Sequence, residues 1–315
     1  MALTLAQAAL LSKDMLQRGV LEIITTSSTV LDRLPFETIE GNAFRYNIEG
    51  VLPAAAFRAV NAGYTESTGT TTQATESLVI LGGDADVDRF LQQTRSDLND
   101  QRAVQTAMKA KAVQAKFSDA FINGDTAVDA NSFNGLKTRL TGAQVITTAG
   151  AAGAPILDTG AGTETNVFFD KLDELISIVP GVDVLYCNAA VLSKFGGAAR
   201  RKTMYTTTLD SIGRSTVTYN GIPLVDVGNK ADGTPIIPQT EVKGGSSVTS
   251  SIYAVNFGQS LGSVGVVGLT NGGMQVMDLG QLQTQPVFRT RIEWYPGLAL
   301  FGPTPAARLT GVLAS

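Results

Sequence analysis

The chain has 315 residues and a mass of 33.0 kDa, which is enough for roughly two domains of ~150 residues each. It contains no histidine and one cysteine, Cys187, which excludes Ser-His-Asp and Cys-His catalysis, zinc sites built from Cys and His, and disulfides within the chain. Charged residues make up 17%, and a net charge of −4 with a pI near 5.0 argues against a protein whose main role is to grip nucleic acid. The sequence has no run of 18 apolar residues and no secretory signal, so we expect no membrane span.

The N-terminal residues 4–18 are predicted to form a helix. Thr4 to Gln7 match a capping box, and Gly19 stands where a left-handed helix cap belongs. This helix either packs on its own domain or serves as an arm that docks on a neighbouring chain.

Residues 36–81 are predicted to form a long two-stranded excursion. Phe44, Tyr46 and Ile48 alternate with polar residues, as in a β-strand, and a returning strand is predicted from Thr70 to Leu81. The alternatives are an ordinary hairpin with a loose polar tip and a long ribbon. A two-stranded ribbon is marginally stable on its own, so a long one needs another surface to lie on.

The strongest helical pattern follows Gly82-Gly83, which is predicted to end the strand. The helical region begins between Asp84 and Asp88, and its main rod runs from about 97 to 122, where Gly124 ends it. One side of the rod carries a basic stripe, which we interpret as a solvent-exposed face. The stripe consists of Arg102, Lys109 and Lys116.

Three acidic residues precede this helix in a D-x-D-x-D pattern, the opening of a calcium loop. Arg89 and Arg95 stand where an EF-hand requires glycine and glutamate, so the motif fails. We place the three carboxylates in the first helical turn, where the helix dipole favours negative charge. A divalent ion shared with another chain is the alternative.

Residues 141–165 are rich in Gly, Ala and Thr and are predicted to be a linker, after which a region of α/β character begins. Prolines at 296, 303 and 305 are predicted to limit regular structure in the tail. The elements expected from 165 onward are helices at 168–179 and 189–200, strands at 182–187, 252–257 and 288–295, and hairpins at 217–227 around Asn220-Gly221 and at 264–277 around Asn271-Gly272.

No motif for catalysis, for a cofactor or for a metal is complete. Residues 258–262 match the G-x-S-x-G nucleophile pattern, but a chain without histidine cannot complete the triad. No phosphate-binding loop occurs, and Cys187 is predicted to be a small residue of the core. We therefore predict no catalytic, cofactor-binding or metal-binding residues and no enzymatic activity.

The order of the predicted elements resembles the major capsid proteins of tailed bacteriophages, of the Hong Kong 97 fold. That order is an N-terminal arm, a long hairpin, a long helix, an α/β domain and a late returning strand. The similarity spans almost the whole chain, and four short sequence segments also resemble phage capsid sequences. These segments are Ile80-Leu81-Gly82-Gly83-Asp84-Ala85-Asp86-Val87-Asp88, Phe121-Ile122-Asn123-Gly124-Asp125, Phe133-Asn134-Gly135-Leu136 and Tyr219-Asn220-Gly221-Ile222-Pro223-Leu224.

The resemblance implies an α+β capsid fold with four parts. These are an N-terminal arm at 1–36, an extended β-hairpin loop at 37–81, a peripheral domain at 82–164 plus 286–315 with a spine helix at about 97–122, and an α/β axial domain at 165–285. It also implies self-assembly through pentamers and hexamers into an icosahedral phage head that encloses double-stranded DNA without sequence-specific binding. Assembly would occur in the host cytoplasm, with a separate scaffolding protein, a portal and, in some heads, a decoration or cement protein as partners.

One departure from the family concerns cross-linking, because some members join a lysine of the extended loop to an asparagine of a neighbour. No lysine occurs between Gly41 and Leu81, so the resemblance implies a shell held by non-covalent contacts. The basic stripe is placed as a hypothesis on the shell interior. The residues expected from position to contact other subunits are Arg45, Tyr46, Arg58, Tyr64, Glu66, Arg89, Arg200 and Arg201.

Two other classes of protein remain open. An encapsulin-like compartment would share the fold but enclose a protein cargo instead of a genome. A histidine-free enzyme that uses carboxylates or a Ser-Lys pair would be a monomer or small oligomer with a concave pocket.

Overall fold

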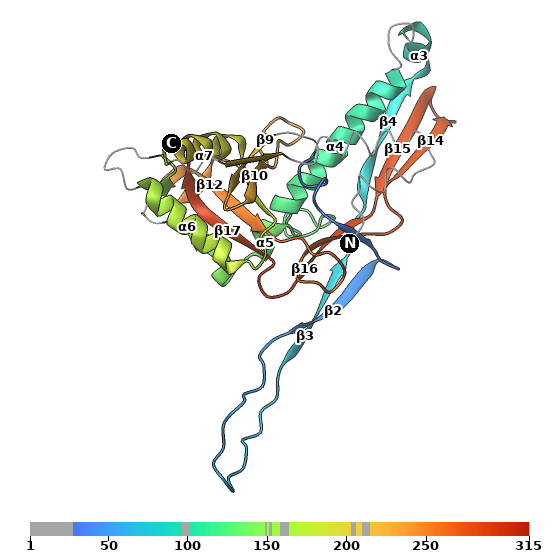
Figure 1. The fold of residues 1–315 in the computed structure, drawn as a ribbon. Helices are drawn as coiled ribbons and strands as arrows, with labels where there is room; N and C mark the ends of the chain where they lie inside the picture. The colour runs from blue at the N-terminus through green and yellow to red at the C-terminus, as the bar shows by residue number, and fades with distance from the viewer. Residues whose placement is uncertain are drawn as a thin grey trace.

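The computed structural model describes residues 28–95, 101–148, 150, 153–157, 164–202, 206–209 and 215–314. Figure 1 shows a sheet with two helices on it, a long helix beside a narrow sheet, and a thin arm that projects away from both. No helix in the described part of the chain is long and apolar enough to cross a membrane. The predicted helix at 4–18 lies outside the described residues, and the described chain begins with a turn that leads into strand β1 (Phe36–Thr38).

The largest unit is a nine-stranded sheet with the order β5-β17-β12-β7-β10-β9-β8, in which β11 pairs with β12 and β6 with β17. Helices α6 (Glu164–Ile178) and α7 (Ala189–Arg201) cover one face, as the pattern at 168–179 and 189–200 predicts. The strands are β5 (Val145–Thr147), β6 (Ala154–Pro155), β7 (Val184–Cys187), β8 (Thr206–Leu209), β9 (Ser215–Tyr219), β10 (Ile222–Asp226), β11 (Glu241–Lys243), β12 (Ser246–Val255) and β17 (Ala306–Leu313).

The central strand β7 is buried on both faces, which explains its continuous apolar run. Leu185 and Cys187 point into the core formed with α6 and α7. Val184 and Tyr186 point into the opposite core, which includes Phe121 of the long helix α4 (Gln101–Asn123). Cys187 is thus the small core residue that the sequence predicts.

The hairpin predicted at 217–227 is confirmed. Strands β9 and β10 pair antiparallel, and Ile222 lies opposite Tyr219. Asn220 and Gly221 both have positive φ, 50° and 81°, as a two-residue type I′ turn requires.

Helix α4 is the predicted rod, and it packs on a three-stranded sheet with the order β14-β15-β4. The strands of this sheet are β4 (Leu81–Asp88), β14 (Gln275–Gln281) and β15 (Val287–Trp294), and the short helix α3 (Arg89–Arg95) follows β4. Phe117 of α4 meets Trp294 of β15 at a ring distance of 4.8 Å and Phe36 at 5.9 Å. These rings form the centre of the larger core.

The prediction that Gly82-Gly83 ends a strand is wrong. The returning strand β3 (Thr71–Ser77) stops earlier, and both glycines lie inside β4, where Gly82 pairs with Glu293. A Cβ at Gly82 would lie 2.3 Å from the Ile292 carbonyl oxygen, so glycine here permits close approach of two strands. The helix accordingly begins at Arg89, not at the carboxylates.

The prediction that residues 264–277 form a hairpin is also wrong. Strand β13 (Gly265–Thr270) pairs with β1 and with β16 (Pro296–Phe301), whereas β14 joins the sheet beside α4. The tail is not irregular, because β16 and β17 occupy it. Their prolines stand at strand starts and in the connection between them, where no ladder hydrogen bond is lost.

The sheets also cross the predicted boundaries at 164/165 and 285/286. Strand β17 belongs to the nine-stranded sheet, and β13 and β14 pair with strands that follow residue 285. The division into peripheral and axial domains stays a prediction, but its sequence limits do not coincide with the limits of the sheets. Pairing between distant segments leaves no local trace in the sequence.

We predict that Phe117→Ala lowers the free energy of unfolding by about 3–5 kcal/mol, because it opens a cavity among three packed rings. The matched control is Met108→Ala on the same helix, whose side chain is 59% exposed and should cost less than about 0.5 kcal/mol. Urea denaturation of the unassembled chain measures both values. Equal losses for the two variants would contradict this description of the core.

Candidate intersubunit surface

The arm is an antiparallel ribbon of β2 (Ala43–Glu49) and β3, paired from Ala43 opposite Ser77 to Glu49 opposite Thr71. Two further backbone bonds extend the ladder: the Gly50 amide donates to the Thr70 carbonyl at 2.8 Å, and the Thr70 amide to the Val51 carbonyl at 3.0 Å. Beyond them the two legs run on without strand pairing, and Figure 1 shows them projecting far from the rest of the chain.

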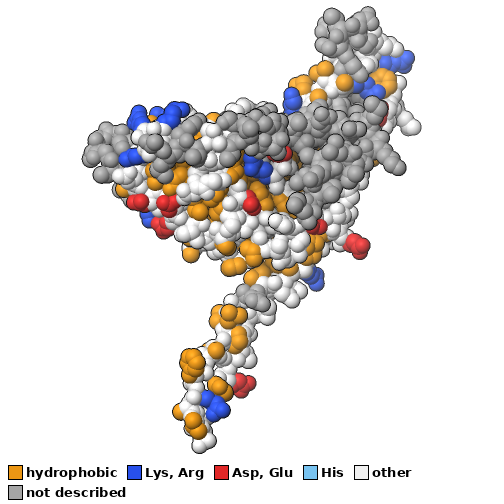
Figure 2. Space-filling model, in the orientation of Figure 1, with side chains coloured by type: hydrophobic (Ala, Val, Ile, Leu, Met, Phe, Trp, Pro, Cys, Tyr) orange, Lys and Arg blue, Asp and Glu red, His pale blue; other side chains and the backbone are white. Residues whose placement is uncertain are grey.

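Large apolar side chains on the arm are exposed to solvent in the single chain. Phe57 and Val60 are 108% and 90% exposed, and Val51, Leu52 and Tyr64 are at least 70% exposed. Figure 2 shows that hydrophobic side chains are spaced along the arm. Exposed apolar side chains that gather on one element mark an interaction surface.

The base of the arm is held by a half-buried ion pair that the sequence did not reveal. Both guanidinium amino groups of Arg139 in α5 (Leu136–Arg139) donate to the Glu76 carboxylate at 2.6 Å, and its Nε donates to the Asn134 carbonyl at 2.7 Å. The Tyr46 hydroxyl donates to the Leu300 carbonyl, and its ring meets Phe301 at 4.8 Å. Arg139 and Glu76 are 63 positions apart in the sequence, which explains why no local pattern marks the pair.

Burial at this base, followed by the nearby Glu76 charge, raises the pKa of Tyr46 to about 12. The phenol therefore stays neutral and remains a hydrogen-bond donor at neutral pH. Tyr46 therefore helps to hold the base of the arm on its own chain.

The other predicted contact residues do not converge on one site. Arg45, Arg58 and Glu66 are exposed on the arm, as is Tyr64, over whose ring the Arg58 guanidinium lies at 5.3 Å. The remaining predicted residues lie elsewhere. Arg89 opens α3, and Arg200 and Arg201 end α7; all three are exposed. The expected contacts thus fall on three separate parts of the molecule, and their role stays a prediction.

The basic stripe is not a free basic face. Arg102 forms an ion pair with Asp278 of β14 at 2.6 Å and lies over the Phe288 ring. Lys109 is half-buried, and its side chain lies against Gly83 of β4. Lys116 alone among the three is exposed, because α4 turns much of this side toward the β4–β15 sheet.

The acidic run is explained by the same sheet. Because side chains alternate along β4, Asp84 and Asp86 lie on one face, opposite Arg291 and Arg289 of β15. Arg291 bonds Asp84 at 2.7 and 3.0 Å, and Arg289 bonds Asp86 at 2.7 and 2.6 Å. Strand position, not a helix start, thus accounts for the pattern. Within the described residues, no group of three or more acidic or cysteine side chains is placed to hold a metal ion.

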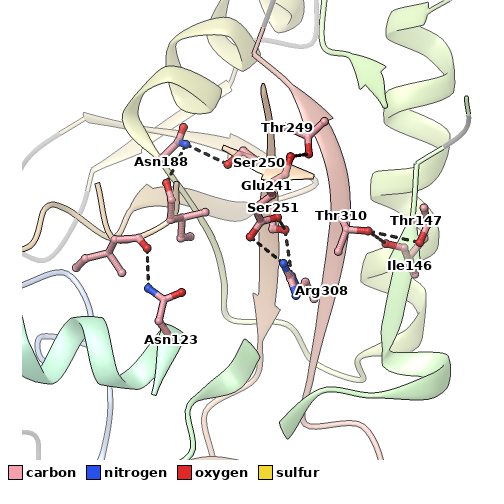
Figure 3. A network of polar contacts seen from close by, with 12 residues as sticks. Asn123, Ile146, Thr147, Asn188, Glu241, Thr249, Ser250, Ser251, Arg308 and Thr310 are labelled. Carbon is pink, nitrogen blue, oxygen red and sulfur yellow. Dashed lines mark hydrogen bonds and ion pairs between the residues drawn. The ribbon is translucent and has the colours of Figure 1, made fainter. Parts of the chain in front are cut away.

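A second polar network fixes the nine-stranded sheet (Figure 3). Arg308 of β17 donates to Glu241 of β11 at 2.8 Å and to the Ser251 hydroxyl of β12 at 3.0 Å. Asn188 caps α7 by accepting from the Val191 amide at 2.9 Å. Since these groups satisfy one another within the chain, the network has a structural role.

The comparisons with known proteins agree with this architecture. The family model described as Major capsid protein GP7 matches residues 13–169, about half of the chain. A comparison with curated proteins gives no match.

Solved structures match over most of the chain. The SrpI encapsulin of Synechococcus elongatus PCC 7942 is 18% identical over 91% of this chain and 88% of that chain, with a TM-score of 0.66. A structure from Microbacterium phage Oxtober96 is 13% identical over 90% of each chain, with a TM-score of 0.60. The capsid of a native GTA particle is 15% identical over 90% of each chain, with a TM-score of 0.59.

At these identities the structural matches establish the fold, which is the α+β Hong Kong 97 fold of shell-forming proteins. The family match adds the kind of shell. The chain is a major capsid protein of the type found in tailed bacteriophages, a structural protein of the virion.

We predict that Arg139→Leu destabilises the chain by about 1–3 kcal/mol, because Glu76 is left half-buried without its cation. The double variant Arg139→Leu/Glu76→Leu should recover part of the loss. The control is Lys171→Leu, which breaks an exposed pair with Glu174 and should change stability by less than about 0.5 kcal/mol. Urea denaturation measures the set, and a control as costly as Arg139→Leu would contradict the assignment.

We further predict a pH-dependent effect at Asp84. Hydrogen bonds from Arg291 hold the pKa of Asp84 below its ordinary value, and those from Arg289 do the same for Asp86. A carboxyl whose pKa is lowered by folding stabilises the fold above the unfolded-state pKa of about 4, and the stabilisation is lost as pH falls through the folded-state pKa.

The stability gap between wild type and Asp84→Asn should therefore be present at pH 7 and shrink as the pH falls below about 4. Urea midpoints measured across this range test it. A gap of constant size would show that the carboxylate charge does not act through the arginines.

Proposed function

We propose that this chain assembles through pentamers and hexamers into an icosahedral phage head around double-stranded DNA. The observation that carries the proposal is the arm, on which Phe57 and Val60 are 108% and 90% exposed in the single chain. A ribbon of two strands gains stability by lying on another chain. Since every copy offers an arm and a body, the contacts are heterologous and close into rings.

The shell is held without covalent cross-links from the arm. No lysine lies between Gly41 and Leu81, so the arm has no amine that could form an isopeptide bond with a neighbour's asparagine. Non-covalent contacts, with or without a decoration protein, hold the subunits together.

The remaining parts of the proposal follow from the protein class. The chain acts without catalysis, and it assembles in the host cytoplasm with a separate scaffolding protein and a portal. Its net charge of −4 suits a container that encloses DNA without binding it in a sequence-specific way.

An encapsulin-like compartment is the second candidate, because the fold matches an encapsulin with a TM-score of 0.66. The two differ in cargo. A phage head encloses a genome, whereas a compartment of this kind encloses protein.

Electron microscopy of the purified protein, paired with size-exclusion chromatography, tests the proposal. We predict closed particles or rings of five and six subunits, and a single 33.0 kDa band when these assemblies are boiled in detergent. Heads isolated from infected cells should contain DNA and no enzyme cargo. A monomer that stays small even with its scaffold co-expressed would contradict the proposal, and a detergent-resistant ladder would contradict non-covalent assembly.

A further inference from the structure

A polar pocket lies on the nine-stranded sheet, on the face opposite helices α6 and α7. Its volume is 740 Å³, within the range of pockets that enclose a small ligand. Side chains alternate along a strand, and Leu309 of β17 and Ile146 of β5 belong to the core beneath the helices. Their neighbours Arg308, Thr310 and Thr147 therefore point to the other face, where they line the pocket.

The pocket has an excess of positive charge. It is lined by three cations, Lys137 of α5, Lys243 of β11 and Arg308, and by one carboxylate, that of Glu241. Arg308 donates to one Glu241 oxygen at 2.8 Å, and the Ser251 hydroxyl donates to the other (Figure 3). The two lysines remain, and neither forms an ion pair with any of the residues that the structure describes.

A β-bulge fixes the position of Lys243. The register between β12 and β17 shifts between Ser250 and Ser251, which leaves Gly311 of β17 as the extra residue. Gly311 has a φ of 81°, in the left-handed region that glycine tolerates. A Cβ at this position would collide with the Lys243 side chain and with the Thr148 hydroxyl. The lysine thus lies directly across the glycine, which positions its ammonium group in the pocket.

The Lys243 ammonium has hydrogen-bonding capacity to spare. It donates to the carbonyl and to the hydroxyl of Thr148, the latter at 2.8 Å. An ammonium has three N–H donors, so one remains for a ligand. Burial lowers the pKa of Lys243, because it disfavours the charged form and no carboxylate compensates. A bound anion would supply that compensation.

Two further donors line the same pocket. Lys137 is exposed, and no hydrogen bond joins its ammonium to the described residues. The Thr147 hydroxyl accepts from the Thr310 hydroxyl at 3.4 Å, so its own proton is available to another acceptor (Figure 3). The pocket therefore offers cationic and hydroxyl donors, while its one carboxylate is already paired.

We propose that this pocket binds a phosphate group through Lys243 and Lys137, with the Thr147 hydroxyl as a further donor. A phosphate monoester carries close to two negative charges at neutral pH and has three acceptor oxygens, which match two ammonium groups and a hydroxyl. The volume leaves room for the group that the phosphate is attached to. Free phosphate compounds and the DNA backbone both present this chemistry, and the test separates these two sources.

Isothermal titration calorimetry of the unassembled full chain with inorganic phosphate tests the site, in chloride buffer of matched ionic strength. We predict saturable binding to the wild type. Lys243→Met and Lys137→Met should each weaken it at least about ten-fold, because each removes a charged hydrogen bond. The matched control is Lys116→Met, since Lys116 is exposed on α4 and does not line the pocket; its affinity should equal that of the wild type.

Lys137→Met is the decisive variant. Lys243 also bonds the buried Thr148, so its loss affects folding as well as binding. Lys137 makes no such bond, so its replacement should leave the urea midpoint unchanged while phosphate affinity falls. Phosphate affinity that is unchanged in Lys137→Met, or that falls equally in Lys116→Met, would overturn the site.

A second titration identifies the source of the phosphate. A short DNA duplex that displaces inorganic phosphate from the wild type, and that itself binds more weakly to Lys137→Met, assigns the pocket to the DNA backbone. Phosphate binding that the duplex leaves unchanged assigns it to a free phosphate compound. Wild-type chain that forms normal particles but takes up no phosphate would overturn the site and leave the capsid function standing.

Discussion

The structure depends on one physical constraint, which is that an apolar two-stranded arm cannot bury its own tip. The polar groups at the base of the arm have partners within the chain: Glu76 is paired with Arg139, the Tyr46 hydroxyl donates a hydrogen bond, and strands β2 and β3 complete their ladder. Everything near the tip is open, with Phe57 fully exposed. The single chain thus holds the arm firmly at one end and leaves the apolar side chains of the other end exposed.

The rest of the fold supplies a rigid body for that arm. Helix α4 and the β14-β15-β4 sheet share a core of aromatic rings around Phe117 and Trp294. The ion pairs of Asp84 and Asp86 with two arginines tie neighbouring strands together on the face of that sheet. Rigidity matters in a shell, because a small angular error in one subunit is repeated at every contact around a closed ring.

Much of the architecture could be predicted from the sequence, for local reasons. The alternation in β2, the small-residue periodicity of α4 and the Asn220-Gly221 turn each record their structure within a few residues. The wrong predictions concern places where the structure depends on pairing between segments that are far apart in the sequence. Gly82 is a glycine because β15 approaches it closely, and the aspartates of β4 face arginines some 200 residues away. The pair of Arg139 with Glu76 was missed for the same reason, since it joins segments far apart in the chain.

The most direct test of the central claim is hydrogen exchange at the backbone amides of residues 52–68, measured in the unassembled chain and in purified particles. These residues lie outside the paired strands, so their amides should exchange rapidly in the single chain. The account predicts strong protection on assembly, while protection in the core around Phe117 stays the same. Equally rapid exchange in intact particles would show that the arm tip is not covered by a neighbour and would contradict the account.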